Sequence, residues 1–176
     1  MIKHGLVLDL SFVEWLDGNI EKLRTREPDA LIYAVRRCCE LKAAVVAADE
    51  RESGVRALLN FGHTFGHAIE AGTGYGTWLH GEAIAAGMVM AAELSHRAGL
   101  IARADLQRVR SLLSRAGLPV SGPAIPAQRM LELMSVDKKA ARGQTRFVLL
   151  QAIGRAVLKG DVSPGLVSEA ILAAVQ

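Results

Sequence analysis

A stripe of polar side chains runs through the otherwise apolar segment 55–71. Arg56, Asn60, His63 and His67 are spaced by four, three and four residues. At about 100° per helical residue, these positions fall within roughly 60° of arc on one face of a helix. Because most other residues of the segment are apolar enough to be buried, we expect the stripe to line a cleft.

The two histidines of this stripe could bind a metal ion. His63 and His67 have the i, i+4 spacing that lets two imidazoles approach one cation. Their motif, HTFGH, lacks the glutamate of HExxH metalloproteases, which argues against a peptidase. His80 begins another helical pattern, where it could supply a third nitrogen ligand or form a helix-start hydrogen bond, and Glu82 could orient an imidazole. Spacing alone leaves a metal site and a structural histidine pair both open.

Three other polar residues have an ordinary interpretation beside a functional one. Lys42 interrupts the apolar stripe of segment 28–49, where a lysine can extend its amine to solvent along an apolar stem. Arg56 could be solvated in the same way, and Glu52 ends a charged run typical of a solvated loop. Residue type therefore does not decide their roles.

Helical periodicity dominates the elements that must position these residues. Ser11 and Glu14 have the spacing of a capping box that opens the first predicted helix. The prediction is a mainly α, multi-helix domain spanning residues 1–176 with one short β-hairpin. The expected helices cover about residues 12–23, 28–49, 55–71, 80–98, 105–116, 127–135 and a segment after 163, and the hairpin pairs residues 145–150 with 156–159. The small residues after His80 should let that helix pack closely on its neighbours.

Composition excludes several classes of function. The chain has 176 residues and a net charge of +3, but its basic residues are scattered among acids, so we expect no nucleic-acid partner. No apolar run approaches the ~20 residues of a membrane helix, so we expect no membrane partner. Cys38 and Cys39 are adjacent in a helical pattern and are predicted to be reduced and buried, as in a cytoplasmic protein. Gly72, Gly74 and Gly76 lack dinucleotide-fingerprint spacing, so this chain alone should not hold NAD⁺.

Long motifs closely resemble 3-dehydroquinate synthases, the shikimate-pathway members of the sugar phosphate cyclases. The resemblance is carried by residues 36–95, RRCCELKAAVVAADERESGVRALLNFGHTFGHAIEAGTGYGTWLHGEAIAAGMVMAAELS, by DKK at 137–139, by FVLLQAIG at 147–154 and by IKHGLVLD at 2–9. It implies the C-terminal, metal- and substrate-binding domain of such an enzyme.

The resemblance also implies roles for individual residues. His63 and His80 match the two histidines with which the family binds a catalytic Zn²⁺ or Co²⁺. His67 and Glu52 match groups that serve in proton transfer. The remaining matches are to groups that bind the phosphate, carboxylate or hydroxyls of the substrate. These are Lys3, Lys42, Arg56, Asn60 and either Lys138 or Lys139.

The chain departs from the family pattern at its first residue. The family's third metal ligand, a glutamate, stands immediately before the segment that matches Met1, and an N-terminal NAD⁺-binding domain precedes it. We expect both to be missing from this chain, so that it is inactive without them. Its expected partners are that domain and a phosphorylated sugar-acid substrate. A homodimer is one alternative, and the oligomeric state stays open.

The reaction implied by the resemblance converts 3-deoxy-D-arabino-heptulosonate 7-phosphate to 3-dehydroquinate and phosphate. It proceeds through transient oxidation by NAD⁺, phosphate elimination, re-reduction, ring opening and aldol closure. Two hypotheses of other kinds stay open: a non-catalytic remnant or partner-binding fragment, and a sibling cyclase or metal-dependent alcohol dehydrogenase.

Overall fold

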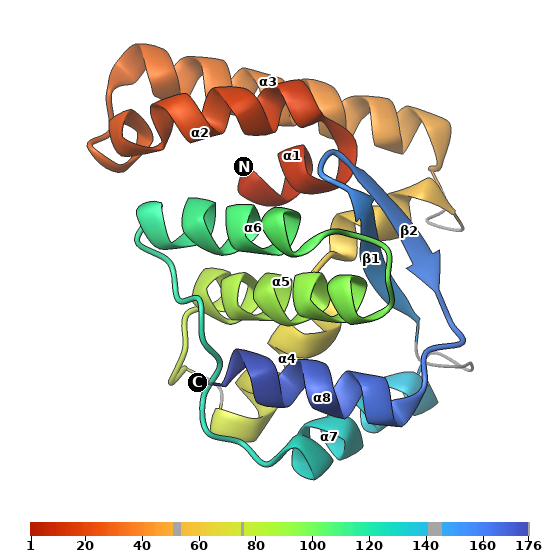
Figure 1. Cartoon of the computed structure of the whole chain (residues 1–176). Coiled ribbons are helices and arrows are strands. Elements are labelled where there is room, and N and C mark those ends of the chain that lie inside the picture. Colours follow the sequence, from red (N-terminus) through yellow and green to blue (C-terminus); the bar gives the residue numbers. More distant parts are fainter. Residues whose placement is uncertain (51–53, 75, 141–145, 176) are drawn as a thin grey trace.

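The computed structural model describes residues 1–50, 54–74, 76–140 and 146–175, and it describes side chains outside residues 136–140. The fold is mainly helical with one antiparallel hairpin, as predicted (Figure 1). In chain order the elements are α1 (Ile2–Leu8), α2 (Leu10–Arg24), α3 (Pro28–Ala48), the 3₁₀ helix η1 (Val55–Asn60), α4 (His63–Thr73), α5 (His80–Arg97), α6 (Arg103–Arg115), α7 (Ala127–Ala140), β1 (Phe147–Ala152), β2 (Arg155–Lys159) and α8 (Pro164–Ala174).

Helix α5 forms the centre of the molecule (Figure 1). Every residue from Ala83 to Ser95 is buried, because α4, α6, α8 and β1 pack around the helix. Most of these residues are apolar, and a helix with apolar side chains on all sides is stable only when it is enclosed in this way. The buried Ser95 hydroxyl donates to Ala91 O at 2.6 Å and accepts from Leu150 N–H at 2.9 Å, which joins β1 to α5.

Helices α1, α2 and α3 form one side of the molecule (Figure 1). Residues 2–8 were not predicted to be helical, but they form α1. The predicted capping box at Ser11 is also wrong, because α2 begins at Leu10 with Asp9 as its N-cap. The Asp9 carboxylate accepts from Phe12 N–H at 3.2 Å and forms an ion pair with Arg37 of α3 at 2.7 Å. Asp9 therefore joins the end of α1 to both neighbouring helices.

The predicted helix over 55–71 is interrupted. Residues 55–60 form η1, and Gly62 has a φ of +81°, in the left-handed region that a regular right-handed helix does not use. Helix α4 starts only at His63. This break changes which side chains share a face with the histidines.

The hairpin β1–β2 packs with its turn against the junction of α1 and α2. Gly154 in the turn has a φ of +85°, and its N–H donates to Leu6 O at 2.9 Å. A Cβ at this position would collide with the backbone of Leu10. The close approach therefore requires glycine, and it locates the hairpin relative to α1.

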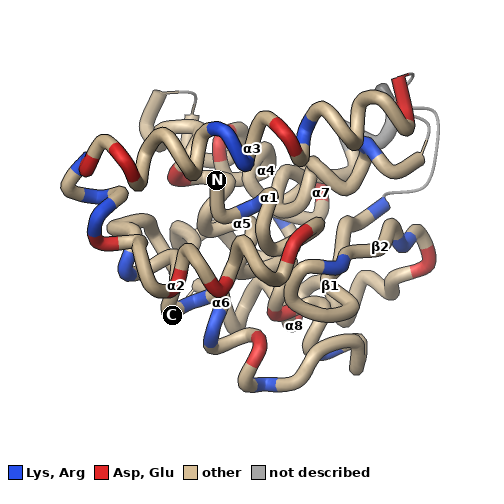
Figure 2. The backbone as a smooth tube through the Cα atoms, turned by 90° about the horizontal axis from the view of Figure 1, so that it is seen from above, with Lys and Arg blue, Asp and Glu red and all other residues tan. Residues whose placement is uncertain are grey.

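Helices α2, α3 and α6 carry both basic and acidic residues (Figure 2). Arg108 and Arg115 of α6 pair with Asp17 and Glu21 of α2 at 2.7 and 2.8 Å. Partly exposed pairs of this kind contribute less than about 1 kcal/mol each. None of the helices in the described part of the chain combines the length and apolarity that crossing a bilayer requires.

Helix α3 is less enclosed than its sequence pattern predicted. Val35, which belongs to the apolar stripe of segment 28–49, is 49% exposed, and Lys42, which interrupts that stripe, is exposed as well. Both thiols are free as predicted, but only Cys38 is partly buried, whereas Cys39 is exposed. The prediction that both cysteines are buried is therefore wrong for Cys39, which lies on the outer side of the helix.

Candidate metal and anion site

Three histidines gather where α4 and α5 begin. His63 is the first residue of α4, His67 follows one turn later, and His80 is the first residue of α5. The ring centroid of His63 lies 5.5 Å from that of His67 and 5.7 Å from that of His80, and those of His67 and His80 are 6.2 Å apart. The structure therefore brings together the three histidines that the sequence singled out.

Glycines in both helices allow this arrangement by letting α4 and α5 approach closely. A Cβ on Gly62 would lie 2.7 Å from Met88 N, and a Cβ on Gly66 would lie 2.6 Å from Ile84 Cδ1. A Cβ on Gly87 would overlap Gly62 O. The predicted close packing of α5 is confirmed, and it brings His63 and His67 close to the start of α5.

The polar stripe has different members from those predicted. Arg56 and Asn60 belong to η1 and are separated from α4 by the turn at Gly62, so they do not continue the face of His63 and His67. Glu70, three residues after His67, does continue it, because positions i, i+4 and i+7 coincide on a helix. The spacing of 63, 67 and 70 was visible in the sequence, but Glu70 was not singled out.

Glu70 is hydrogen-bonded to His80. The Nδ1 atom of His80 lies 3.1 Å from Glu70 Oε1, and the carboxylate side chain is only 15% exposed. The prediction that Glu82 orients an imidazole is not supported by its contacts. Glu82 Oε2 accepts from the backbone N–H of Leu79 at 3.0 Å and so caps the start of α5.

The imidazole nitrogens suit zinc or cobalt. Nitrogen ligands at about 2.1 Å from one tetrahedral zinc place two imidazole centroids roughly 5 Å apart, close to both His63 distances. His63 Nδ1 lies 3.3 Å from Phe61 O, and a carbonyl only accepts, so this contact favours a proton on Nδ1 and a lone pair on Nε2. Among the described residues, no three His, Cys, Asp or Glu side chains converge closely enough to hold a metal by themselves. The donors fit the metal in type, as an incomplete set.

Burial keeps His63 in the form that a metal ligand requires. Loss of hydration lowers the pKa of His63 to about 4, and the nearby charge of Lys3 contributes in the same direction. The imidazole is therefore neutral at pH 7 and has a lone pair to donate. Neutral, half-buried His63 can therefore donate this lone pair to a metal ion.

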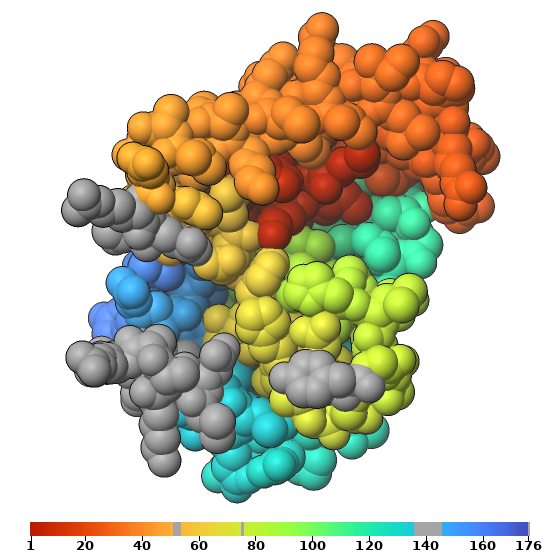
Figure 3. Space-filling view, turned by 180° about the vertical axis from the view of Figure 1, so that it is seen from behind, coloured from red at the N-terminus to blue at the C-terminus, as the bar shows by residue number. Residues whose placement is uncertain are grey.

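A cavity of about 460 Å³ opens beside these histidines. Its lining combines the polar side chains of Lys3, Arg24, His63 and His80 with apolar side chains of α1, α2 and α5 and of the segment that follows α6. Burial lowers the pKa of Lys3, and the charge of Lys42 lowers it further, so the two ammonium groups act on one another across α1 and α3. Figure 3 shows this face, where α1 is recessed beneath α3 beside η1, α4 and the start of α5. Two neighbouring cations favour binding of an anion such as phosphate or carboxylate.

The other predicted site residues belong to η1 or lie outside the described part of the chain. The Arg56 guanidinium donates to Glu50 O at 2.9 Å, and its backbone N–H donates to Asp49 Oδ2 at 2.9 Å. Asn60 is exposed at the end of η1. Glu52 lies outside the described residues, and so do the side chains of residues 138 and 139, the predicted Lys138 and Lys139.

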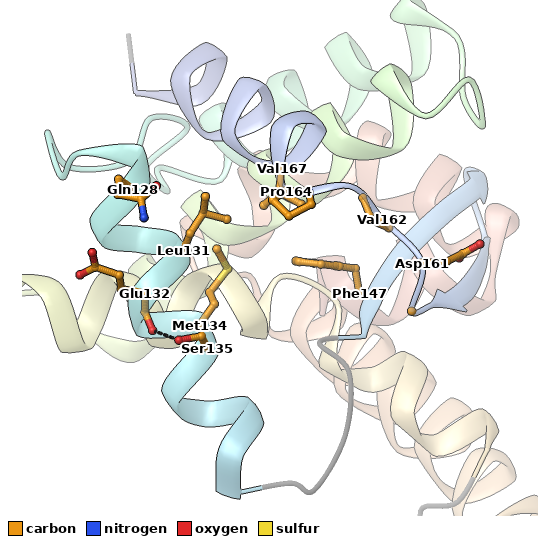
Figure 4. A pocket seen from close by; sticks show the side chains of 11 residues that line it. Gln128, Leu131, Glu132, Met134, Ser135, Phe147, Asp161, Val162, Pro164 and Val167 are labelled. Carbon is orange, nitrogen blue, oxygen red and sulfur yellow. Dashed lines mark hydrogen bonds between the residues drawn. The ribbon is translucent and has the colours of Figure 1, made fainter.

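A larger cavity, of about 630 Å³, lies away from the histidines between α7, β1 and α8 (Figure 4). Its wall includes Leu131, Phe147 and Val167, and the charged side chains among its described lining residues are the carboxylates of Glu132 and Asp161. These two carboxylates disfavour the binding of phosphate next to the described part of the wall. The smaller histidine cavity is therefore the better candidate for a phosphorylated ligand.

Solved structures of two synthases are among those that resemble the chain. It is 28% identical to the 2-epi-5-epi-valiolone synthase of Streptomyces hygroscopicus subsp. jinggangensis, solved with NAD⁺ and Zn²⁺, with a TM-score of 0.89 over 98% of this chain and 48% of that one. It is 26% identical to a 2-deoxy-scyllo-inosose synthase complexed with carbaglucose-6-phosphate, NAD⁺ and Co²⁺, with a TM-score of 0.71 over 84% of this chain and 43% of that one. The chain thus spans about half the length of these proteins.

The sequence also matches a family defined by the C-terminal part of 3-dehydroquinate synthase. The match covers residues 1–140, which include all three histidines and both lysines of the site. The chain therefore belongs to the 3-dehydroquinate synthase C-terminal family, within the sugar phosphate cyclases.

Proposed function

We propose that the chain supplies the metal- and anion-binding half of a cytoplasmic 3-dehydroquinate synthase. The reaction would convert 3-deoxy-D-arabino-heptulosonate 7-phosphate to 3-dehydroquinate and phosphate in the shikimate pathway. The observation that carries the proposal is that Lys3 lines the same cavity as His63 and His80, with Lys42 close enough to lower the pKa of Lys3. A metal site beside paired cations suits a substrate with hydroxyl, carboxylate and phosphate groups.

Each residue of the site has a proposed role. Imidazole nitrogens of His63 and His80 would hold Zn²⁺ or Co²⁺, and a metal there would polarise adjacent hydroxyl and carbonyl oxygens. Lys3 and Lys42 would bind the anionic groups of the substrate. His67, on the same face of α4 as His63, is the proposed proton-transfer residue, together with Glu52.

The remaining proposals concern the outer parts of the site. Arg56, Asn60 and either Lys138 or Lys139 would contribute further substrate contacts. NAD⁺ would be held mainly by the other half of the enzyme, which corresponds to the part of the solved relatives that this chain does not cover. Hydride transfer therefore requires that half.

A sibling cyclase is the second candidate, and the similarity to the valiolone and inosose synthases favours it. The two candidates differ in the anions that the site must bind. The heptulosonate substrate carries a carboxylate as well as a phosphate, whereas glucose 6-phosphate, whose carbocyclic analogue is bound in the inosose synthase, carries only the phosphate. Removing a cation that binds the carboxylate should therefore weaken only the heptulosonate.

The test of ligand class is calorimetric titration of the chain with inorganic phosphate, the heptulosonate 7-phosphate and glucose 6-phosphate. We expect Lys3→Met and Lys42→Met to weaken binding of the heptulosonate 7-phosphate. Lys22→Met, which changes an exposed residue of α2, should leave this binding unchanged. Tighter binding of the heptulosonate than of glucose 6-phosphate supports the 3-dehydroquinate synthase. Equal binding of the two sugars, or no effect of either site lysine, would contradict it.

The test of activity adds a separately produced NAD⁺-binding half of a related synthase, with Zn²⁺ and NAD⁺. Phosphate release and 3-dehydroquinate formation are expected only in the mixture, because the redox step needs the added half. Product from the chain alone would refute this division of labour. Product from glucose 6-phosphate but not from the heptulosonate would support the sibling cyclase.

A further inference from the structure

Glu70 occupies the same face of α4 as two of the histidines and reaches across to the third. It follows His63 by seven residues and His67 by three, which places the three side chains within roughly 60° of arc. Its Oε1 lies 3.1 Å from His80 Nδ1 on the neighbouring helix. The Glu70–His80 pair therefore joins α4 to the start of α5 at the edge of the candidate metal site.

The two partners differ in exposure, which indicates which one positions the other. The side chain of His80 is 60% exposed, whereas that of Glu70 is 15% exposed. An exposed imidazole has few packing contacts to set its rotamer, so a hydrogen bond can decide how the ring is turned. A mostly buried carboxylate in turn requires a donor, because an unsatisfied buried acceptor is costly.

We propose that Glu70 is a positioning residue that holds the His80 ring with its proton on Nδ1 and its Nε2 lone pair directed toward the metal. This inference rests on the proposed metal site and adds a residue to it. An ionised carboxylate can only accept a hydrogen bond, so the ring nitrogen that faces Glu70 must carry the hydrogen. The opposite nitrogen is then the ligand atom. Carboxylates that orient metal-binding histidines in this way strengthen metal affinity by about 10- to 100-fold.

Glu82 provides a matched comparison within the same few residues. It is also a carboxylate near His80, but its Oε2 accepts from the backbone N–H of Leu79 at 3.0 Å. Substituting Glu82 should loosen the start of α5 without removing the acceptor of the imidazole. A purely structural effect at this helix end would therefore appear in Glu82 variants as strongly as in Glu70 variants.

The first readout is the tautomer of His80 in the metal-free chain, measured from imidazole ¹⁵N chemical shifts at a pH where the ring is neutral. We expect Nδ1–H in the wild type and in Glu82→Gln, and a shift toward Nε2–H in Glu70→Ala. Glu70→Gln, which keeps a weaker acceptor, should be intermediate. A wild-type His80 protonated on Nε2 would overturn the proposal, and this result needs no variant to fold.

The second readout is Zn²⁺ affinity by calorimetry, with the Co²⁺ absorption spectrum as a check on coordination. Glu70→Ala should weaken zinc binding by about 10- to 100-fold and Glu70→Gln by less, whereas Glu82→Gln should bind like the wild type. Unchanged affinity in Glu70→Ala, or an equal loss in Glu82→Gln, would overturn the inference. A wild type that binds no zinc would refute the metal site itself, while the tautomer would still decide whether Glu70 orients His80.

Discussion

Replacing Gly62 by alanine should separate the two helices that carry the histidines. The left-handed φ of +81° costs a non-glycine residue about 1–2 kcal/mol. The new Cβ would also lie 2.7 Å from Met88 N and 2.9 Å from Ile84 O, backbone atoms that cannot turn aside. Overpacking of this kind costs about 1–3 kcal/mol. We therefore expect Gly62→Ala to lower the free energy of unfolding by about 2–5 kcal/mol.

Two other glycines separate these contributions. Gly99 has a φ of +71° but no neighbour within 4 Å of its Cβ position, so Gly99→Ala should show only the backbone cost of about 1–2 kcal/mol. Gly18 lies within α2 with open space around it, so Gly18→Ala should stabilise the protein by about 0.5–1 kcal/mol. Urea titrations followed by far-UV circular dichroism would rank the three variants.

The order of the three variants tests the close approach of α4 and α5. If Gly62→Ala is no less stable than Gly99→Ala, the steric part of the argument is wrong and the two helices are not held together as described. A Gly62→Ala variant that folds should also bind zinc more weakly than Gly99→Ala, because His63 follows directly after the displaced residue.

Two further predictions concern the region of α1. Asp9→Ala removes the N-cap of α2 and the ion pair with Arg37, so it should lower the free energy of unfolding, measured by urea titration, by about 1–3 kcal/mol. Ser11→Ala should have little effect, because the cap predicted for Ser11 is not formed. Burial, more than the neighbouring positive charges, lowers the pKa of His4 to about 4, and its Nδ1 is buried without a partner in the described structure. Because the pKa of His4 in the folded protein lies below its ordinary value, protonation of His4 favours unfolding. The free energy of unfolding should therefore be highest above pH 6.5, where His4 is neutral in both states, and should fall as the pH is lowered toward 4. For a half-exposed ring, the free energy of unfolding should fall by about 1–2 kcal/mol over this pH range. The fall should be smaller in His4→Gln, and equal pH profiles of stability for the wild type and His4→Gln would contradict the prediction.

Much of the fold could be predicted from sequence because the apolar periodicity and the hairpin signal are strong. Helix α1 was missed because it has only seven residues and no capping side chain. The capping signal was misplaced by two residues, since Asp9 and Ser11 are both good N-caps and only tertiary contact with Arg37 favours Asp9. Local pattern cannot supply that contact.

The cluster of His63, His67 and His80 and the position of Lys3 beside it agree with the sequence prediction, but Glu70 was not predicted. The periodicity predicted one helix over residues 55–71, whereas η1 ends at Asn60 and α4 begins at His63, so Arg56 and Asn60 do not share one continuous helix with the histidines. Glu82 was assigned an orienting role from its nearness in sequence, but Glu70 is the carboxylate that the packing of α4 on α5 brings to His80. These errors arise because side-chain partners between helices depend on how the helices pack.

The central claim, that His63 and His80 together bind a catalytic metal, is tested most directly by zinc calorimetry on the chain. We predict that His63→Ala and His80→Ala each weaken zinc binding by more than the ~10- to 100-fold expected for loss of a supporting residue. His67→Ala should largely spare binding, and so should His96→Ala, a control whose Nδ1 contacts Ile101 O at 3.0 Å. Equal losses in the His63, His67 and His80 variants would contradict the assignment of ligands, and zinc binding that survives in His63→Ala and His80→Ala would contradict the site.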